Sequence, residues 1–129
     1  MNRKALPLAS ASLLFFLLGC ASTPTPEKDW ALGEWRFRQT FSTPAQDNVL
    51  TGKLRIERGE GQYQGSLYLD VLKEWEVLDE VQVSKGSIHF YRPGYPESFD
   101  GTPGDQGMKG KWNTRGGTYM DGHWEATRN

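Results

Sequence analysis

The stretch from Gly33 to Phe41 has the sequence GEWRFRQTF, and its pattern decides the fold class expected for the chain. Aromatic or amide side chains occupy every second position from Trp35 onward, and charged or hydroxyl side chains fill the positions between them. Successive side chains of a β-strand point to opposite faces. The alternation therefore predicts a strand with one face toward a core and the other toward solvent.

The same period of two recurs along the rest of the chain. The alternating runs carry Leu54 and Ile56, Tyr63 to Val71, Trp75 and Val77, Val81 and Val83, Ile88 and Phe90, Gly110 and Trp112, and Met120 to Ala126. Glycine-rich turn signals separate them, for example Gly59-Glu60-Gly61 and Arg115-Gly116-Gly117. Only the short run from Asp70 to Glu80 competes as a helix.

We therefore predict an all-β fold, a small antiparallel meander of about eight strands. Closure stabilises such a meander because it removes the exposed strand edges. The sheet is therefore expected to form a closed or nearly closed barrel. A small β-sandwich or a flattened barrel with a tryptophan-rich core is the alternative.

The composition excludes several classes of protein. The chain has 129 residues, a formal net charge of −1, one cysteine, 15 glycines and 16 aromatic residues in the form of 5 Trp, 5 Tyr and 6 Phe. This length allows one domain, which excludes a multidomain enzyme. The single cysteine excludes a disulfide scaffold and a four-cysteine zinc site, and the charge excludes a strongly basic nucleic-acid binder.

The first twenty residues have the layout of an export signal. Arg3 and Lys4 precede an uncharged stretch from Ala5 to Leu18, which is too short to span about 30 Å of hydrocarbon. The stretch ends in Leu17-Leu18-Gly19-Cys20. This ending resembles the lipobox of bacterial lipoproteins, and the alternative is an ordinary signal peptide with an accidental cysteine. The resemblance implies a diacylglyceryl group on the Cys20 thiol, cleavage after Gly19 and acylation of the new amino terminus.

The expected organisation has three parts: a signal peptide at 1–19, the lipidated Cys20 with a flexible tether to residue 29, and a β-barrel domain at 30–129. The tether is small, polar and proline-bearing, which is typical of an extended linker. Two or three acyl chains anchor a protein stably. Ala21 after the cysteine favours the outer membrane, facing the periplasm, if the source is Gram-negative. The expected partners are thus a membrane, reached through the anchor on Cys20, and a small ligand or an envelope protein, but not a nucleic acid.

Glycine repeatedly stands two positions before a large apolar residue. The pairs are Gly33/Trp35, Gly52/Leu54, Gly65/Leu67, Gly86/Ile88, Gly110/Trp112 and Gly122/Trp124. A glycine inside a strand is costly unless it permits a bend or a close approach, so this recurrence predicts a strongly coiled sheet.

Three residues carry a second resemblance. Gly33-Glu34-Trp35 on the first strand and Arg128 on the last strand of a meander resemble the calycin barrels, the lipocalins and avidins. The resemblance implies that Trp35 plugs the barrel floor and that Arg128 packs across it. Arg128 has the parity of Trp124 and Ala126, and we therefore expect its guanidinium to stack on the Trp35 indole.

Basic side chains form the most unusual surface feature. Arg36 and Arg38 on the first strand are expected beside Lys53 and Arg55 on the second, all facing outward. Like charges side by side cost free energy unless a counter-ion meets them. An anionic glycan or a lipid head group could be that partner; alternatively, each long side chain is solvated singly.

The segment 92–107 contains three prolines and four glycines together with Tyr95 and Phe99. It is expected to be a semi-rigid loop, or a short strand between loops. Loops at a barrel rim often carry recognition, which makes Tyr95 and Phe99 candidate binding residues. Alternatively, the segment is a connector whose aromatic side chains cover the core.

No set of residues predicts catalysis, a metal site or a cofactor. Asp121, His123 and Glu125 share a strand face, but alternate strand positions stand about 7 Å apart and converge poorly on one ion. Glu74, Glu76, Asp79 and Glu80 cluster without a cleft of the kind that paired catalytic carboxylates need, and a charged strand edge explains them better.

The expected function is that of a non-catalytic, membrane-tethered binding module of the cell envelope. The alternative is a protein-interaction or inhibitor barrel that acts through rim loops. We expect the interior to be largely filled, because aromatic side chains would occupy most of so small a lumen. The candidate inward residues are Trp35, Phe37, Phe41, Tyr63, Phe90, Trp112, Met120 and Trp124.

Overall fold

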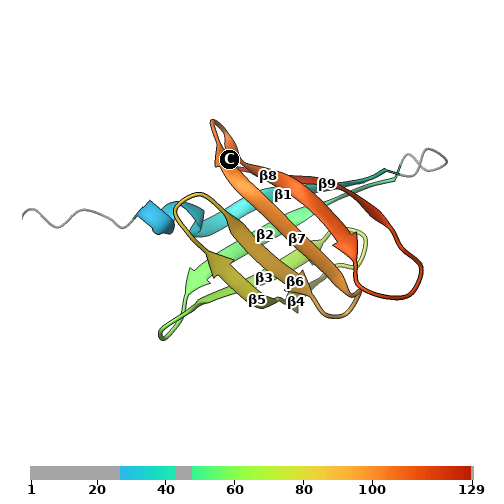
Figure 1. The fold of residues 1–129 in the computed structure, drawn as a ribbon, viewed down its shortest axis with the longest axis horizontal. Helices are drawn as coiled ribbons and strands as arrows, with labels where there is room; N and C mark the ends of the chain where they lie inside the picture. The colour runs from blue at the N-terminus through green and yellow to red at the C-terminus, as the bar shows by residue number, and fades with distance from the viewer. Residues whose placement is uncertain (1–26, 43–47, 129) are drawn as a thin grey trace, which may run out of the picture.

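The computed structural model describes residues 27–42 and 48–128, which form one short 3-10 helix and nine strands. The elements are η1 (Glu27–Ala31), β1 (Gly33–Phe41), β2 (Val49–Arg58), β3 (Tyr63–Leu69), β4 (Glu74–Val77), β5 (Asp79–Val83), β6 (Ile88–Arg92), β7 (Glu97–Gly104), β8 (Gly107–Thr114) and β9 (Asp121–Thr127). Figure 1 shows η1 at one end of the molecule. The described structure thus begins inside the segment expected to be the tether.

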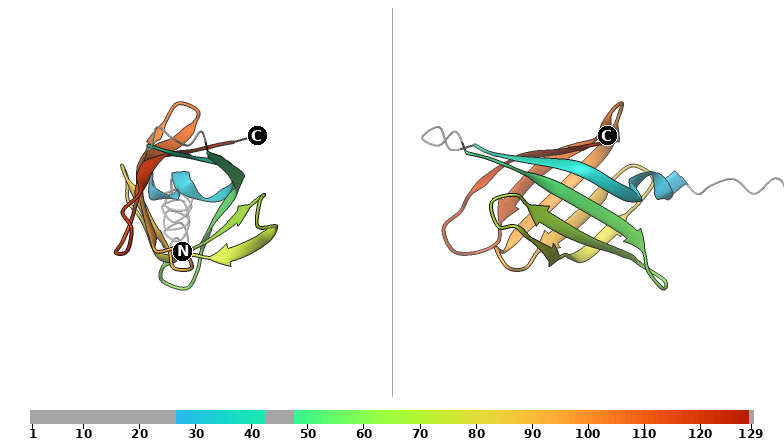
Figure 2. Two further views of the ribbon diagram at one scale, coloured as in Figure 1. Left: turned by 90° about the vertical axis from the view of Figure 1, so that its right-hand side faces the viewer. Right: turned by 180° about the vertical axis from the view of Figure 1, so that it is seen from behind.

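All the described strands belong to one antiparallel sheet with the order β4-β3-β2-β1-β9-β8-β7-β6-β5. Strands that follow one another in the chain are paired, except β4 and β5, and β1 also pairs with β9. Seen along its length, the sheet curls into a ring (Figure 2). The expected all-β meander is confirmed, and it forms a nearly closed barrel with one seam between β4 and β5.

Strand β7 decides between the two alternatives left open for segment 92–107. It covers Glu97–Gly104, and it pairs along its length with β8. Its glycines and Pro103 weaken the strand pattern in the sequence, but Pro103 lies near the strand end, where a missing N–H costs least. The alternative of a short strand between loops is therefore confirmed, and the segment is not a single loop.

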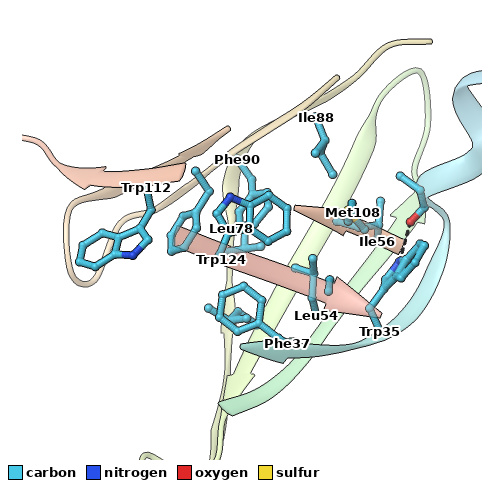
Figure 3. Packing of buried hydrophobic residues seen from close by; sticks show 14 of the residues in the cluster. Trp35, Phe37, Leu54, Ile56, Leu78, Ile88, Phe90, Met108, Trp112 and Trp124 are labelled. Carbon is cyan, nitrogen blue, oxygen red and sulfur yellow. Dashed lines mark hydrogen bonds between the residues drawn. The ribbon is translucent and has the colours of Figure 1, made fainter. Parts of the chain in front are cut away.

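The core is aromatic and continuous. Phe90, Phe99 and Trp124 are almost completely buried, with ring centroids between 4.8 and 6.2 Å apart. Figure 3 shows Phe90 and Trp124 close together among the other buried side chains. Of the expected inward residues, Trp35, Phe37, Phe90, Trp112 and Trp124 are buried, and Phe41 and Tyr63 pack partly buried against the core.

Met120 is the exception among the expected inward residues. It is 38% exposed, and it lies in the turn just before β9. Its backbone carbonyl accepts a hydrogen bond from the Thr114 backbone N–H and so belongs to the β8–β9 connection. The expectation that Met120 fills the lumen was wrong, because the strand pattern was extended one residue too far toward the turn.

Glycines allow neighbouring strands to approach closely. A Cβ atom at Gly110 would lie 1.8 Å from the Asp100 carbonyl oxygen on β7. A Cβ atom at Gly52 would lie 1.8 Å from the Tyr68 carbonyl oxygen on β3. These backbone contacts show that Gly52 and Gly110 mark close approaches, which the small barrel needs in order to coil, whereas a Cβ atom at Gly86 would meet nothing within 4 Å.

Side chains close the seam in place of a strand ladder. The Leu78 backbone N–H donates to the Gly65 carbonyl at 2.9 Å, just past the end of β4. Inside, Leu78 and Val81 lie close to Gly65, where a Cβ atom would be 3.3 Å from each of them. Further along, Glu76 on β4 binds Arg92 on β6, so an ion pair links the two sides of the seam.

Arg128 closes the end of the barrel that carries η1. Its guanidinium lies 3.7 Å from the centroid of the Trp35 ring, so the predicted stack is present. Arg128 Nη2 donates to the carbonyls of Trp30 and Leu32, at 3.2 and 2.9 Å. Gly33 has a φ of 117°, and a Cβ atom there would lie 2.5 Å from Arg128 Nη1. Glycine at position 33 therefore leaves the room that the guanidinium occupies.

Candidate functional site

The strongest chemical feature outside the core is a basic face on β1, β9 and β8. Arg38 on β1 lies opposite Glu125 on β9, and Glu125 lies opposite Lys109 on β8. One step along the strands, His123 on β9 lies opposite Lys111 on β8. All five side chains point away from the core because they alternate with buried residues. The pairing of β1 with β9 brings these distant segments together.

These residues line a groove of about 450 Å³. The lining is formed by Arg38 and Thr40 on β1, Thr102 on β7, Lys109, Gly110 and Lys111 on β8, and His123, Trp124 and Glu125 on β9. We call this the basic groove. Arg38, Lys109 and Lys111 bring three permanent positive charges to it, against the single carboxylate of Glu125.

Among the described residues, no ion pair is formed by Arg38, Lys109 or Lys111, and none links Glu125 to its neighbours. Three other arginines on the barrel wall are engaged: Arg55 binds Glu34 at 3.1 Å, Arg58 binds Asp29, and Arg115 binds Glu80 at 2.8 Å. Three uncompensated cations around one concave surface give a local positive potential that favours anions.

The four basic residues singled out in the sequence separate in the structure. Arg36 and Lys53 lie opposite each other on β1 and β2, as expected, and both are exposed. Arg55 lies opposite Glu34, binds it, and stacks over Trp75 with the guanidinium carbon 4.2 Å from the ring centroid. Arg55 is therefore neutralised, and Arg38 joins the groove on the other side of β1.

The two aromatic candidates of segment 92–107 have different surroundings. Phe99 is completely buried between Phe90 and Trp112, so its proposed role as a binding residue was wrong. Tyr95 lies in the β6–β7 turn, is 48% exposed and packs its ring 3.9 Å from the Arg92 guanidinium. Tyr95 therefore covers the interior charge of Arg92, and part of its own side chain remains exposed to solvent.

That interior charge belongs to a buried polar cluster. Arg92 is 2% exposed and donates to Glu76 at 2.6 and 3.0 Å and to Glu97 at 3.1 Å. Gln39 Nε2 donates to Glu97 at 3.5 Å, while Gln39 Oε1 has no hydrogen-bond partner among the described residues. Burial raises the pKa of Glu97 despite the opposing charge of Arg92. The cluster links the two sides of the seam, and desolvation is the main cause of the raised pKa of Glu97.

A second network lies on the wall formed by β5, β6 and β7. His89 Nδ1 is 2.8 Å from Asp100 and Nε2 is 3.1 Å from Glu80. Glu80 also accepts two hydrogen bonds from Arg115, which lowers its pKa to about 2, with His89 as the next contributor. Glu80 has a positive φ of 53° at the irregularity in β5. Its unusual backbone aims the carboxylate at both partners, so the acidic cluster is more than a charged edge.

Asp121, His123 and Glu125 share one face of β9 but have separate surroundings. Over residues 27–42 and 48–128, no group of three or more histidine, cysteine, aspartate or glutamate side chains is arranged to hold a metal ion. His123 and Glu125 face the basic groove, and Asp121 accepts a hydrogen bond from the Tyr119 hydroxyl at 3.3 Å. In the same ranges, no helix has the length and apolar character that crossing a membrane requires.

The sequence reasoning missed Lys109, Lys111 and His123 as site residues. A usable signal existed, because the two lysines flank Gly110 with a spacing of two and must share a strand face. The two lysines can be assigned to the basic groove only when it is known that β9 lies between β8 and β1. Cys20, the predicted lipidation site, lies outside the described residues.

Comparison with known proteins adds no further assignment: no family model matches the chain, and neither a curated protein nor a solved structure matches it.

Proposed function

We propose that this protein is a non-catalytic binding module of the cell envelope, tethered to a membrane by lipid on Cys20, that takes an anionic ligand in the basic groove. The chemistry recognised is a phosphate, sulfate or carboxylate group. In a Gram-negative cell, the anchor places the module on the outer membrane, facing the periplasm. Kinship with calycin barrels is part of the proposal, and the stack of Arg128 on Trp35 supports it.

The packing of the interior favours recognition on the surface. Phe37, Phe90, Phe99, Trp112 and Trp124 are buried together, and their ring centroids are close enough for direct contact. A lumen filled in this way suits a protein that binds its ligand on its outer surface better than one that encloses a lipid chain. The same observation would also suit the alternative, an inhibitor acting through rim loops, and the charge of the basic groove favours the binding module.

The observation that carries the proposal is the convergence of Arg38, Lys109 and Lys111, all without an ion-pair partner among the described residues, on one groove. Arg38 and Lys109 lie on either side of Glu125, and one carboxylate against three cations leaves the lining with an excess of positive charge that an anionic ligand neutralises when it binds. Charge-assisted hydrogen bonds to arginine and lysine are stronger than neutral ones. The groove is open, which suits a ligand that is part of a larger molecule.

Inorganic polyphosphate is a suitable probe because it supplies anionic groups without sugar rings or lipid chains. We expect the full chain, purified in detergent, to bind it with an affinity that falls as salt rises. The variant Lys109→Gln/Lys111→Gln should bind at least about tenfold more weakly, which corresponds to about 1.4 kcal/mol. Isothermal titration calorimetry measures both affinities.

The variant Lys73→Gln/Lys85→Gln is the matched control, because it removes two lysine charges from turns away from the groove. It should bind polyphosphate within about twofold of the original chain. Equal losses in the two double variants would show a response to net charge alone and would refute the groove as the site.

A further inference from the structure

A row of four side chains crosses the outer face next to the basic groove. The strand register places Trp75 on β4 opposite Tyr68 on β3, Tyr68 opposite Lys53 on β2, and Lys53 opposite Arg36 on β1. Neighbouring strands lie about 4.8 Å apart, so the row extends over about 14 Å. It therefore runs from two aromatic rings to two cations, and Arg36 is two residues from Arg38 in the groove.

The aromatic end of the row is unusual for an outer barrel face. Trp75 is 39% exposed, and its ring lies 5.5 Å from the Tyr68 ring at an interplanar angle of 53°. Trp30, Trp35, Trp112 and Trp124 each donate their indole N–H to a backbone carbonyl. In the described part of the chain, Trp75 alone among these tryptophans makes no such bond. Its indole N–H therefore donates to no backbone carbonyl of the described residues.

Contacts with neighbouring side chains hold the Trp75 indole in place. The Arg55 guanidinium packs 4.2 Å from its centroid, and Glu34 fixes Arg55 by a hydrogen bond of 3.1 Å. A ring held in this way loses little conformational entropy when a ligand stacks on it. The Lys53 ammonium lies 5.9 Å from the Tyr68 ring, at the junction between the aromatic and the cationic halves of the row.

We propose that this row binds an anionic polysaccharide, with a sugar ring stacked on Trp75 and Tyr68 and its carboxylates or other acidic groups meeting Lys53 and Arg36. The inference rests on the proposed function and specifies its ligand class. Sugar rings have apolar C–H faces that pack on aromatic rings, and about 14 Å accommodates two or three linked sugars. A simple anion has no use for the aromatic end.

The test uses an oligogalacturonate, in which every ring carries a carboxylate, with inorganic polyphosphate as the ring-free probe. The variant Trp75→Ala should weaken oligogalacturonate binding about tenfold and leave polyphosphate binding within twofold. The variant Trp75→Tyr should retain most of the affinity, because it keeps a stacking surface. The variant Arg36→Gln/Lys53→Gln should also weaken oligogalacturonate binding, and this loss should shrink at high salt.

Indole N–H resonances provide a second readout. Oligogalacturonate should shift the Trp75 signal, which is identified by its loss in Trp75→Ala, and leave the signals of the buried Trp112 and Trp124 in place. Oligogalacturonate affinity unchanged by Trp75→Ala would overturn the inference while leaving the proposed function intact. Polyphosphate binding independent of Lys109 and Lys111 would instead overturn the proposed function. An altered oligomeric state in Trp75→Ala, measured by sedimentation, would identify the row as a self-association surface and would also overturn the inference.

Discussion

Arg128 makes both a cation–π contact and hydrogen bonds through one exposed side chain. It stacks on Trp35, and it donates hydrogen bonds to the backbone carbonyls of Trp30 and Leu32, just before β1. Arg128→Ala should lower the free energy of unfolding by about 2 kcal/mol, because it removes a cation–π contact and charge-assisted hydrogen bonds. Urea denaturation measures the change. Arg36→Ala removes an exposed arginine from the barrel wall and should cost less than about 0.5 kcal/mol; equal losses would contradict the closing role.

Glu80 should make stability depend on pH. Its pKa is about 2 in the folded chain against an ordinary value of 4.5, chiefly because Arg115 donates to it. A carboxylate with a lowered pKa stabilises the fold above its unfolded value, and that stability is lost as the pH falls through the folded value. The urea midpoint of the original chain should therefore drop between pH 4.5 and pH 2, and Glu80→Gln should reduce the drop. Glu57→Gln, at an exposed carboxylate of β2, should leave the drop unchanged.

At the scale of strands, close packing at glycines limits what the sheet tolerates. A Cβ atom at Gly110 would overlap the Asp100 carbonyl, whereas a Cβ atom at Gly86 would meet nothing within 4 Å. Gly110→Ala should therefore cost about 1–3 kcal/mol, because β7 and β8 must separate to accommodate the methyl group. Gly86→Ala, in the β5–β6 turn, should be close to neutral. Thermal unfolding of the pair checks the prediction, and similar melting temperatures would show that the strands can shift without cost.

The seam shows how a meander closes when two consecutive strands do not pair. Glu76 and Arg92 lie on strands with no shared ladder, and their two hydrogen bonds span the gap. Removing Arg92 would leave Glu76 and Glu97 close together without a cation, and buried pairs broken in this way typically cost about 3–5 kcal/mol. We therefore expect Arg92→Met to destabilise the barrel more than Arg55→Met, which breaks an exposed pair. Equal shifts in the urea midpoint would contradict a role of the ion pair in closing the seam.

At the scale of the whole molecule, the proposed lipid anchor on Cys20 would decide where the barrel works. The described chain begins with η1, seven residues after Cys20, and a chain of that length reaches at most about 25 Å. If Cys20 carries lipid, the end closed by Arg128 lies near the bilayer. Cys20→Ser should then abolish lipidation and release the protein from the membrane fraction or leave its signal uncleaved. Unchanged mass and fractionation would refute the lipoprotein interpretation.

Much of this architecture was predictable from local pattern. The alternation around Trp35 and Phe37 identified β1 and its inward face, because the strand period is a property of the backbone itself. The stack of Arg128 on Trp35 was predicted from the resemblance to calycin barrels, and the parity of Arg128 with Trp124 agreed with it. Segment 92–107 was left open between a loop and a short strand, because its glycines and Pro103 resemble a loop when the β8 partner that satisfies the backbone of β7 is not known.

The chain alone therefore determined which side chains face outward, and the tertiary structure decided which outward side chains meet. Arg38 and Lys109 are both visibly exposed positions, yet only the β1–β9 pairing brings them to opposite sides of β9. Arg55 was also predicted to face outward, but it forms an ion pair with Glu34, its neighbour on the adjacent strand. It therefore adds no unpaired positive charge to the surface. Side-chain direction follows from covalent geometry within one strand, whereas charge compensation depends on neighbours that closure brings from distant parts of the chain.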